Sequence, residues 1–479
     1  MLCKRVIARL DIKGNKLIKG IRFEGVRVIG DPNKAARHYE KEGADELLYI
    51  DAVASLYGRN SISSILKIAS NEIFIPITAS GGIRSVSDAK DLIMAGADKI
   101  AINTEGIKNP SLIKDLVATF GSQCVVISIQ ARKKNDGINW EAMTEMGREK
   151  SGKDVLEWIK EVQDIGAGEI LLTSVDQDGT LTHPDFELIK RASSITRIPL
   201  IISGGLTATP DIKSVLENDL VSGVALGGSL HYKKQSISLL KDKLSNKELN
   251  LRKNNPKNLP LLQKKPLKNI KVGIINYNMG NQQSLINTLH YLGADVFVSK
   301  DHKELDKSDM LILPGVGAFP IGMSNLKKYN LDFFIKTKVQ EGVPLIGICL
   351  GMQMLFKNSS EFKLTSGLNL INGNVRIMKN DKIKLPHMGW NKIIATKNNF
   401  YSLNNLYQYF VHSYVAFNVN NEEVIYKSTY SDETFIAGVK KNNIIGLQFH
   451  PERSGPLGME LLTKIIIDQC EGFNPQNNY

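Results

Sequence analysis

The sequence contains little cysteine and no long apolar run. The four cysteines among its 479 residues are Cys3, Cys124, Cys349 and Cys470, and no two of them form a Cys-x-x-Cys pair. This spacing argues against a structural zinc site or a disulfide framework, and it favours a reducing compartment such as the cytoplasm. The longest uncharged apolar stretch, Val343 to Phe356, has 14 residues, which suits buried core better than a membrane span.

The N-terminal segment is also poor in apolar residues. Only Val6 to Leu10 is apolar before Asp11 interrupts the run, which is too short for the core of a signal peptide. Because no metal-ligand spacing or membrane span is present, we expect no metal, no cofactor and no membrane partner.

Basic residues outnumber acidic ones by 61 to 49, which gives a net charge of +12. More than half of this excess lies between Lys241 and Ile270, a segment with nine basic residues, two acidic residues and three prolines. Such a segment is typical of a solvated linker. No nucleic-acid-binding motif accompanies it, so a nucleic-acid-binding protein is a remote alternative and we expect no nucleic-acid partner. The predicted division is a first domain over 1–243, a linker over 244–269 and a second domain over 270–472.

The first domain alternates short β-branched runs with amphipathic stretches. Eight such runs are predicted to be strands, namely residues 6–12, 46–52, 75–82, 99–104, 124–130, 169–176, 199–205 and 221–228. Eight strands with helical spacers predict an α/β fold of the (β/α)₈ barrel type. In such barrels the carboxyl ends of the strands carry the chemistry, and many of these runs end in polar residues or glycine.

The first domain also repeats itself. Ser80-Gly81-Gly82 recurs 123 residues later as Ser203-Gly204-Gly205, and Ile102-Asn103-Thr104 corresponds roughly to Gly227-Gly228-Ser229. Two half-barrels with matching glycine-rich loops predict two similar sites that face each other. Exposed backbone N–H groups of such loops suit phosphate oxygens, although ordinary strand-to-helix turns are the alternative. The predicted phosphate-binding residues are Gly81, Gly82, Asn103, Thr104, Gly204, Gly205, Gly228 and Ser229.

The second domain carries a nucleophile motif. Gly347 and Gly351 flank Cys349 at the spacing of a nucleophile elbow, in which a strained strand-to-helix turn exposes the side chain. His450 supplies a base, and Glu452 two residues later can orient its imidazole. The Pro314-Gly315-Val316-Gly317 turn offers N–H groups for an oxyanion, so Gly315, Val316 and Gly317 are candidates for that role. An ordinary buried cysteine is the alternative, but three motifs agree on a hydrolytic triad.

These motifs resemble the class I glutamine amidotransferases, and more narrowly the glutaminase subunit of imidazole glycerol phosphate synthase. The resemblance covers most of residues 270–470, including Tyr277–Asn281, Pro386–Asn391 and Val411–Tyr414. It implies a doubly wound glutaminase domain that hydrolyses glutamine at Cys349. It also implies that Gln353 contacts the glutamine and that a loop carrying Trp390 faces the barrel.

The first domain resembles the cyclase subunit of the same family over nearly its whole length. Matching stretches include Leu10-Asp11, Lys19-Gly20 and Asp176–Thr180. The resemblance implies a substrate with two phosphates, a general acid or base at Asp11 and a substrate contact at Lys19. It also points to a ring of charges at the opposite mouth of the barrel that gates ammonia, formed by Arg5, Glu46, Lys99 and Glu169.

One position departs from the family pattern. The family has a second catalytic aspartate on the fifth strand, where this chain has Gln130. Glutamine cannot ionise, so it cannot act as an acid or base. Asp51 and Asp176, on neighbouring strand ends, are the nearest carboxylates by motif that could substitute for it.

Two functions therefore remain open. In the first, ammonia from glutamine reacts in the barrel with a bisphosphorylated ribulosyl substrate, giving imidazole glycerol phosphate and the aminoimidazole carboxamide nucleotide of histidine biosynthesis. In the second, the same unit supplies ammonia to a separate ATP-dependent amidotransferase that makes acetamidino sugars for surface polysaccharides. Gln130 favours the second function, whereas Asp11, Lys19 and the paired loops favour the first.

Overall fold

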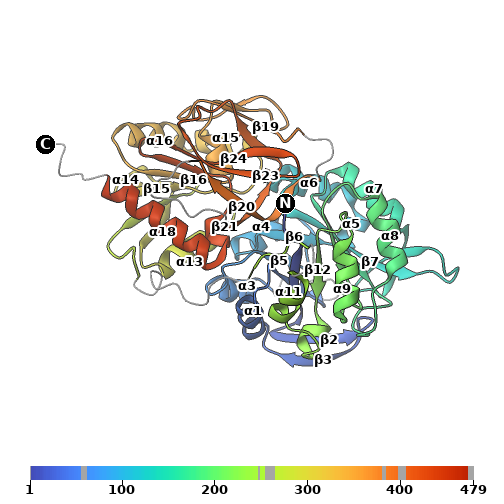
Figure 1. Ribbon diagram of the computed structural model, residues 1–479. Coiled ribbons are helices and arrows are strands. Elements are labelled where there is room, and N and C mark those ends of the chain that lie inside the picture. The colour runs from blue at the N-terminus through green and yellow to red at the C-terminus, as the bar shows by residue number, and fades with distance from the viewer. Residues whose placement is uncertain are drawn as a thin grey trace. The chain divides into compact units, whose positions relative to one another are not determined.

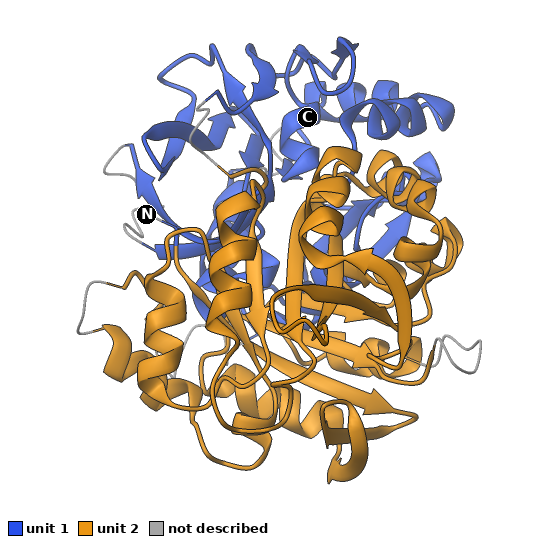
Figure 2. Ribbon diagram, turned by 90° about the vertical axis from the view of Figure 1, so that its right-hand side faces the viewer, with its two compact units in different colours: residues 1–2, 255–383, 387–479 blue, residues 3–254, 384–386 orange. Residues whose placement is uncertain are grey.

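The computed structural model describes residues 2–54, 62–245, 249–253, 265–379, 384–396 and 406–472. The chain divides into two compact units, one built mainly from residues 3–254 and the other mainly from residues 255–479 (Figure 2). Each unit has its own sheet and its own core.

Eight parallel strands form a closed barrel in the first unit. They are β1 (Arg5–Lys13), β4 (Glu46–Asp51), β5 (Ile77–Ser80), β6 (Lys99–Ile102), β7 (Val125–Lys133), β10 (Glu169–Ser174), β11 (Leu200–Ser203) and β12 (Gly223–Leu226). Each strand pairs in parallel with the next, and β12 pairs with β1, which closes the ring. The predicted (β/α)₈ barrel is confirmed.

Helices surround these strands (Figure 1). They are α1 (Pro32–Lys41), α3 (Ser63–Ser70), α4 (Val86–Met94), α5 (Thr104–Lys108), α6 (Pro110–Phe120), α7 (Val155–Ile165), α8 (Phe186–Ile195), α9 (Thr209–Glu217), α10 (Gly228–His231) and α11 (Ile237–Ser245). Local sequence sets several of their starts: Asp31 caps α1 with Pro32 in its first turn, and Asp154 caps α7. Two hairpins extend the barrel strands, formed by β2 (Lys16–Ile21) with β3 (Glu24–Gly30) and by β8 (Trp140–Thr144) with β9 (Glu149–Asp154).

The interior of the barrel is packed. One buried apolar layer takes one residue from each of six strands and two from β4, namely Ile7, Leu48, Ile50, Ala101, Val126, Leu171, Ile201 and Ala225. Along β1 the inward side chains therefore run from Arg5 through Ile7 to Arg9 and Asp11, because side chains alternate along a strand. The layer separates the charged groups at the two ends of the barrel.

The second unit is built on a nine-stranded sheet with a parallel half and an antiparallel half. The parallel strands are β14 (Asp295–Ser299), β13 (Lys271–Ile275), β15 (Met310–Leu313), β16 (Leu345–Ile348) and β25 (Ile444–Leu447). The sheet continues with β24 (Glu433–Lys441), β23 (Val424–Tyr430), β20 (His387–Ala395) and β21 (Leu406–His412). A small second sheet contains β17 (Asn358–Ser359), β18 (Thr365–Ser366), β19 (Asn374–Ile377) and β22 (Tyr414–Phe417).

The helices of this unit are α13 (Gln283–Tyr291), α14 (His302–Leu305), α15 (Phe319–Lys328), α16 (Leu331–Gln340), α17 (Leu350–Met354) and α18 (Gly455–Glu471). Several of them bury apolar residues, including Met323 of α15 and Leu350 of α17, in one cluster that also contains Leu311 of β15 and Leu345 of β16. The predicted α/β fold of the second domain is confirmed.

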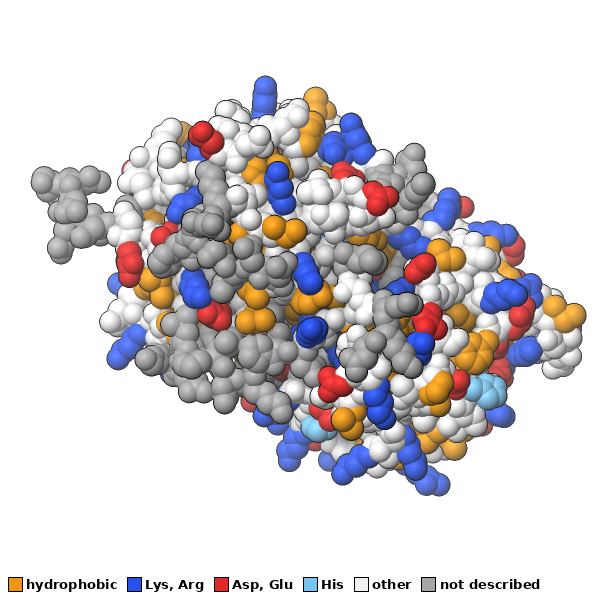
Figure 3. Space-filling model, viewed as in Figure 1, with side chains coloured by type: hydrophobic (Ala, Val, Ile, Leu, Met, Phe, Trp, Pro, Cys, Tyr) orange, Lys and Arg blue, Asp and Glu red, His pale blue; other side chains and the backbone are white. Residues whose placement is uncertain are grey.

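The surface shows no single-sign stripe on the face drawn in Figure 3, where Lys and Arg side chains are dispersed with Asp and Glu between them. Within the described residues, every helix is either too short or too polar to cross a membrane.

Part of the predicted linker packs on the barrel. Of residues 244–269, positions 246–248 and 254–264 lie outside the described residues. Leu251 and Arg252 are buried, and Arg252 Nε is 2.7 Å from Asp45 Oδ1. Burial raises the pKa of Asp45, but Lys241 and Arg252 outweigh it and hold that pKa below its usual value. Arg252 therefore belongs to the barrel unit, although it lies beyond the predicted boundary at residue 243. Its cation compensates the buried carboxylate of Asp45.

We expect Arg252→Met to lower the free energy of unfolding of the barrel unit by about 3 kcal/mol, because Asp45 loses a buried partner. The measurement is urea unfolding followed by tryptophan fluorescence in a Trp390→Phe background, where the remaining tryptophans belong to the barrel. Lys213→Met, at a partly exposed surface pair, should change stability by less than about 0.5 kcal/mol. Equal effects of the two substitutions would contradict the assignment.

Candidate active sites

Cys349 occupies a strained turn between β16 and α17. Its φ of 53° and ψ of −108° lie in a region that non-glycine residues rarely adopt. Gly347 and Gly351 make the turn possible, since a Cβ at Gly351 would lie 1.8 Å from the carbonyl oxygen of Leu313. Cys349 N–H donates to the Leu447 carbonyl at 2.7 Å, which anchors the turn to β25. The geometry is that of a nucleophile elbow.

Parallel pairing brings the predicted triad to one edge of the sheet. Ile348 at the end of β16 is paired with Leu447 at the end of β25, so Cys349 and the segment leading to His450 leave the sheet together. His450 Nδ1 is 2.7 Å from Glu452 Oε1, which leaves Nε2 to serve Cys349. Burial lowers the pKa of His450, but Glu452 and Cys349 outweigh it and raise that pKa well above its usual value. This arrangement favours a thiolate–imidazolium pair.

The turn predicted to bind the oxyanion lies at the same edge. Leu313 ends β15 opposite Gly347 of β16, so the turn over 314–317 begins next to the elbow. Tyr277 Oη donates to the Pro314 carbonyl at 2.6 Å. The Gly315 carbonyl accepts from Leu350 N–H, and a Cβ at Gly315 would lie 2.5 Å from Tyr277 Oη. Gly315, Val316 and Gly317 are therefore held against the start of α17.

Gln353 is part of a buried hydrogen-bond network that reaches the nucleophile. Its amide donates to the Tyr414 carbonyl at 2.9 Å and to Gln448 Oε1 at 3.2 Å. The amide nitrogen of Gln448 in turn lies 3.7 Å from Cys349 Sγ. Gln448 can thus donate to a thiolate, and Gln353 orients Gln448.

Two buried histidines extend this network, and their tautomers follow from their partners. His412 Nδ1 is 3.0 Å from the Tyr414 carbonyl, so Nδ1 must be the donor. His412 Nε2 then accepts from His387 Nδ1 at 3.0 Å, and His387 Nε2 accepts from the Asn391 amide at 3.2 Å. Burial lowers the pKa of His412 to about 3 and that of His387 well below its usual value, so both rings are neutral.

Trp390 departs from its predicted setting. It was expected on a loop facing the barrel, but it lies within β20 and its side chain is fully buried. Its backbone pairs with Tyr409 of β21, and the two rings meet edge to face. Pairing along β21, which is rich in aromatic residues, makes this segment a strand instead of a loop.

Glu361 is a titratable group beside the glutaminase site that motif reasoning missed. Its Oε2 accepts from Phe319 N–H, at the start of α15, at 2.7 Å. Burial raises its pKa to about 7, against the lowering effect of that hydrogen bond. Its charge also acts on Tyr414, whose carbonyl holds Gln353. Only its burial distinguishes Glu361 from a surface glutamate, so the sequence carried no signal for it.

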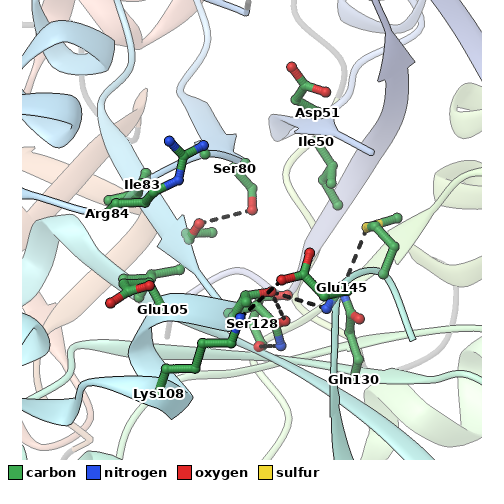
Figure 4. A pocket seen from close by; sticks show the side chains of 17 residues that line it. Ile50, Asp51, Ser80, Ile83, Arg84, Glu105, Lys108, Ser128, Gln130 and Glu145 are labelled. Carbon is green, nitrogen blue, oxygen red and sulfur yellow. Dashed lines mark hydrogen bonds and ion pairs between the residues drawn. The ribbon is translucent and has the colours of Figure 1, made fainter. Parts of the chain in front are cut away.

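The predicted phosphate-binding residues separate into two pockets at the carboxyl ends of the barrel strands. Gly81, Gly82, Asn103 and Thr104 line the first, which encloses about 790 Å³ (Figure 4). Gly204, Gly205, Gly228 and Ser229 line the second, of about 270 Å³. The structure thus brings together both predicted sets. Asp178, which belongs to a cluster of charged side chains, also lines the second pocket.

Those charged side chains form a closed cluster around Asp11. Asp11 Oδ1 is 2.8 Å from Arg9 Nε, and Asp11 Oδ2 is 2.9 Å from Lys19 Nζ. Asp178 completes the cluster, at 3.3 Å from Arg9 and 2.7 Å from Lys19. All four residues are buried. Arg9 and Asp178 were not predicted, although the inward alternation along β1 would have placed Arg9 beside Asp11.

The other acid–base candidates lie apart from this cluster. Gln130 and Asp51 line the first pocket, and the Gln130 amide contacts Met146 Sδ at 3.7 Å. Figure 4 shows both side chains at the edge of that pocket. Asp176 instead accepts from Lys133 N–H at 2.8 Å. The carboxylate that shares Lys19 with Asp11 is Asp178, two residues after Asp176.

The four charges predicted at the opposite end of the barrel do meet. Lys99 Nζ is 2.7 Å from Glu46 and 2.6 Å from Glu169, and Arg5 bridges the same two carboxylates. Burial raises the pKa of Glu169, but Arg5 and Lys99 outweigh it and lower that pKa overall. Each of the four residues is the first of its strand, so parallel register brings them into one ring.

Known families match both halves of the chain. The family described as Histidine biosynthesis protein matches residues 5–236, and the family described as Glutamine amidotransferase class-I matches residues 273–469. The Imidazole glycerol phosphate synthase subunit HisF of Legionella pneumophila is 57% identical over 202 residues, which are 42% of this chain and 95% of that protein. The subunits of the same name from Lactococcus lactis (strain IL1403) and Clostridium botulinum (strain Alaska E43) are each 41% identical, over 94% and 100% of their lengths and 51% and 53% of this chain.

The chain belongs to the imidazole glycerol phosphate synthase family. Its barrel is HisF-like, and a class I amidotransferase domain follows on the same chain. For a synthase of this family, the elbow at Cys349 and the paired pockets in the barrel are the two places where chemistry is expected. Asp11 and Gln130 both lie on the carboxyl-terminal parts of the barrel strands.

We expect the unliganded amidotransferase unit to lose stability as pH rises, because Glu361 has a folded-state pKa of about 7. A raised folded pKa means that its stabilising effect is present below the unfolded value of about 4.3 and is lost as pH rises through 7. Glu361→Gln removes this dependence, so between pH 5 and pH 8 the mutant should gain on the order of 2–3 kcal/mol relative to wild type.

The measurement is urea unfolding followed by Trp390 fluorescence, with Trp140 and Trp158 replaced by Phe. Glu471→Gln, at an exposed position, is the control and should show no such gain. If the difference in free energy of unfolding between Glu361→Gln and wild type does not change with pH, the assignment is contradicted.

Proposed function

We propose that this chain is a glutamine amidotransferase of the imidazole glycerol phosphate synthase type, in which ammonia released at Cys349 reacts in the barrel. The acceptor in this proposal is a bisphosphorylated ribulosyl compound, and the products are imidazole glycerol phosphate and the aminoimidazole carboxamide nucleotide. The observation that carries it is the elbow geometry of Cys349 beside the His450–Glu452 pair, on one chain with a barrel that has two opposed pockets.

The glutaminase reaction follows from the geometry of the elbow. His450 takes the proton of Cys349 Sγ, and the thiolate attacks the carboxamide carbon of glutamine. N–H groups of the Gly315–Gly317 turn stabilise the oxyanion. His450 returns the proton to the leaving nitrogen, so ammonia departs and a thioester remains. Water, deprotonated by His450, hydrolyses the thioester to glutamate.

Substrate glutamine would be held by Gln353 and Glu361. Gln353 is fixed by the Tyr414 carbonyl and lies next to Gln448, which contacts the nucleophile. Within the described part of the chain no cation pairs with the buried carboxylate of Glu361, and the α-ammonium group of glutamine would supply one.

Ammonia would travel along the barrel axis. The ring of Arg5, Glu46, Lys99 and Glu169 closes one end, and the apolar layer that includes Ile7 and Leu171 lies beyond it. An apolar path excludes ammonium and water while admitting neutral ammonia. Opening the ring therefore requires one ion pair to separate, which makes these four charges a gate in this proposal.

Both pockets suit a substrate with a phosphate at each end. Gly81 and Gly204 have φ values of +113° and +101°, so glycine is required for the loops to expose their N–H groups. Ser229 Oγ, which is buried in the second pocket, makes no hydrogen bond within the described residues and is free to donate to phosphate. Lys19 would contact the substrate between the two phosphates.

A second candidate function rests on Gln130. A barrel without a carboxylate at this position lacks an acid–base group, which is typically worth roughly 10²- to 10⁴-fold in rate. The same glutaminase and barrel would then supply ammonia to a separate ATP-dependent enzyme that amidates a sugar. Asp51, one of the carboxylates that line the first pocket, could take over proton transfer.

Cys349→Ala should abolish glutamine hydrolysis, because no other group at the elbow can form the thioester. Any acceptor reaction in the barrel should survive when ammonium salts replace glutamine. The measurement is glutamate release, with ammonium-dependent turnover as the control. Glutamate release that persists in the mutant would disprove the nucleophile assignment.

Wild-type protein should convert the ribulosyl bisphosphate with ammonium salts, more slowly than a synthase with aspartate at position 130. Gln130→Asp should raise this rate, because it returns an ionisable group to the first pocket. Gln130→Asn is the matched neutral control. Protein that binds the bisphosphate but never converts it, in either form, would favour the ammonia-supply function.

A further inference from the structure

The buried cluster of Arg9, Asp11, Lys19 and Asp178 has a cation that the proposed chemistry does not use. Arg9 extends inward from β1, two residues before Asp11, and its guanidinium reaches Asp11, Asp178 and Ser203 Oγ. It also stacks over the ring of Phe23, 5.3 Å from the ring centre to Cζ. Only 2% of Arg9 is exposed, so its position is fixed on every side.

This cluster is balanced in charge and closed in its hydrogen bonding. Arg9 and Lys19 supply two positive charges, and Asp11 and Asp178 supply two negative charges. Each carboxylate gives one oxygen to Arg9 and the other to Lys19. Both Asp11 oxygens are therefore engaged by cations, which favour the ionised carboxylate and make Asp11 a weak base toward a substrate proton.

We propose that Arg9 withdraws Asp11 from proton transfer, and so sets how much cyclase chemistry this barrel performs. This inference rests on the proposed function, because it concerns the rate of the reaction assigned to the barrel. A carboxylate transfers protons best when its pKa is close to the working pH. An ion pair on each oxygen keeps the pKa away from that value. Arg9 is thus a positioning residue that acts through Asp11.

The electrostatics support this inference. Burial raises the pKa of Asp11, but Arg9 and Lys19 outweigh it and hold that pKa far below its usual range. His231 of α10 also faces the cluster, and burial lowers its pKa to about 4 despite the attraction of Asp11. Lys13 and Arg148 line the pocket next to Asp11 and add positive charge. The cations around Asp11 therefore outweigh the effect of its burial.

Removing Arg9 would reverse this balance. Lys19 would then face two carboxylates, Asp11 and Asp178, in a buried site. Two carboxylates that share one cation bind a proton more readily, because like charges disfavour double ionisation. One proton should therefore be taken up at a higher pH, and Asp11 would become a usable base.

The test compares Arg9→Met with Arg9→Lys in the full-length chain, each in wild-type and Gln130→Asp backgrounds. Met removes the charge and keeps the apolar stem, whereas Lys keeps the charge. Turnover of the ribulosyl bisphosphate with ammonium salts is measured from mildly acidic to mildly basic pH. We expect Arg9→Met to raise turnover about tenfold or more and to make turnover fall at acidic pH. We expect Arg9→Lys to keep the wild-type dependence of turnover on pH.

A second measurement does not depend on turnover. Titration of ¹³C-labelled aspartate carboxyls should show one carboxyl that takes up a proton in Arg9→Met and not in wild type or Arg9→Lys. Adding Asp11→Asn identifies the signal. Arg9→Gln, neutral and polar, repeats the test if the Met variant fails to fold.

The outcomes separate this inference from the proposed function. If no variant turns over the bisphosphate but the titration changes as expected, the cyclase proposal fails and the role of Arg9 stands. If turnover and titration are the same in Arg9→Met and wild type, the role of Arg9 is disproved. Equal losses in Arg9→Met and Arg9→Lys would show that Arg9 is structural only.

Discussion

Parallel strand register is the constraint on which both sites depend. When two parallel strands are paired, the segments that follow two paired residues leave the sheet at the same edge. Ile348 pairs with Leu447, and this pairing alone delivers Cys349 and the His450 segment to one place although about a hundred residues separate them. In the barrel the same rule collects four first residues, Arg5 among them, into one ring at one end and two glycine-rich loops at the other.

Buried charge is the second feature on which the barrel depends. Three separate sites bury ionised groups and compensate each of them with opposite charges, namely the ring that includes Arg5, the cluster around Asp11 and the Asp45 site with Lys241 and Arg252. Removing one partner from such a site is costly, because the remaining charge stays buried. Compensation also lowers reactivity, since a carboxylate held by cations is a weak base. The ring and the Asp11 cluster therefore combine stability with control over what can move through the barrel and what can react there.

The two halves differ in how fully their chemistry could be predicted. In the amidotransferase domain the elbow, the base and its orienting glutamate were all read from local motifs, and the structure brings all three to one edge. In the barrel the loops and the strand count were equally clear, but the motif gave no sign that Asp178 would share a cation with Asp11. A motif identifies the loop after β10, but which of its carboxylates reaches Asp11 depends on how the turn packs.

The sequence by itself determined the eight-stranded barrel, the elbow at Cys349 and the pairing of the two glycine-rich loops, because each is set by periodicity or by glycine at a fixed spacing. Tertiary structure decided which side chains are buried together. Glu361 carries no local signal, and the chemistry of Glu361, Arg9 and Asp178 depends on partners that are distant in the chain, such as Phe319 for Glu361 and Asp178 for Arg9. Trp390 also required the fold, since its burial depends on pairing with Tyr409. Electrostatic shifts depend on burial and neighbouring charges, and only the packed chain supplies both.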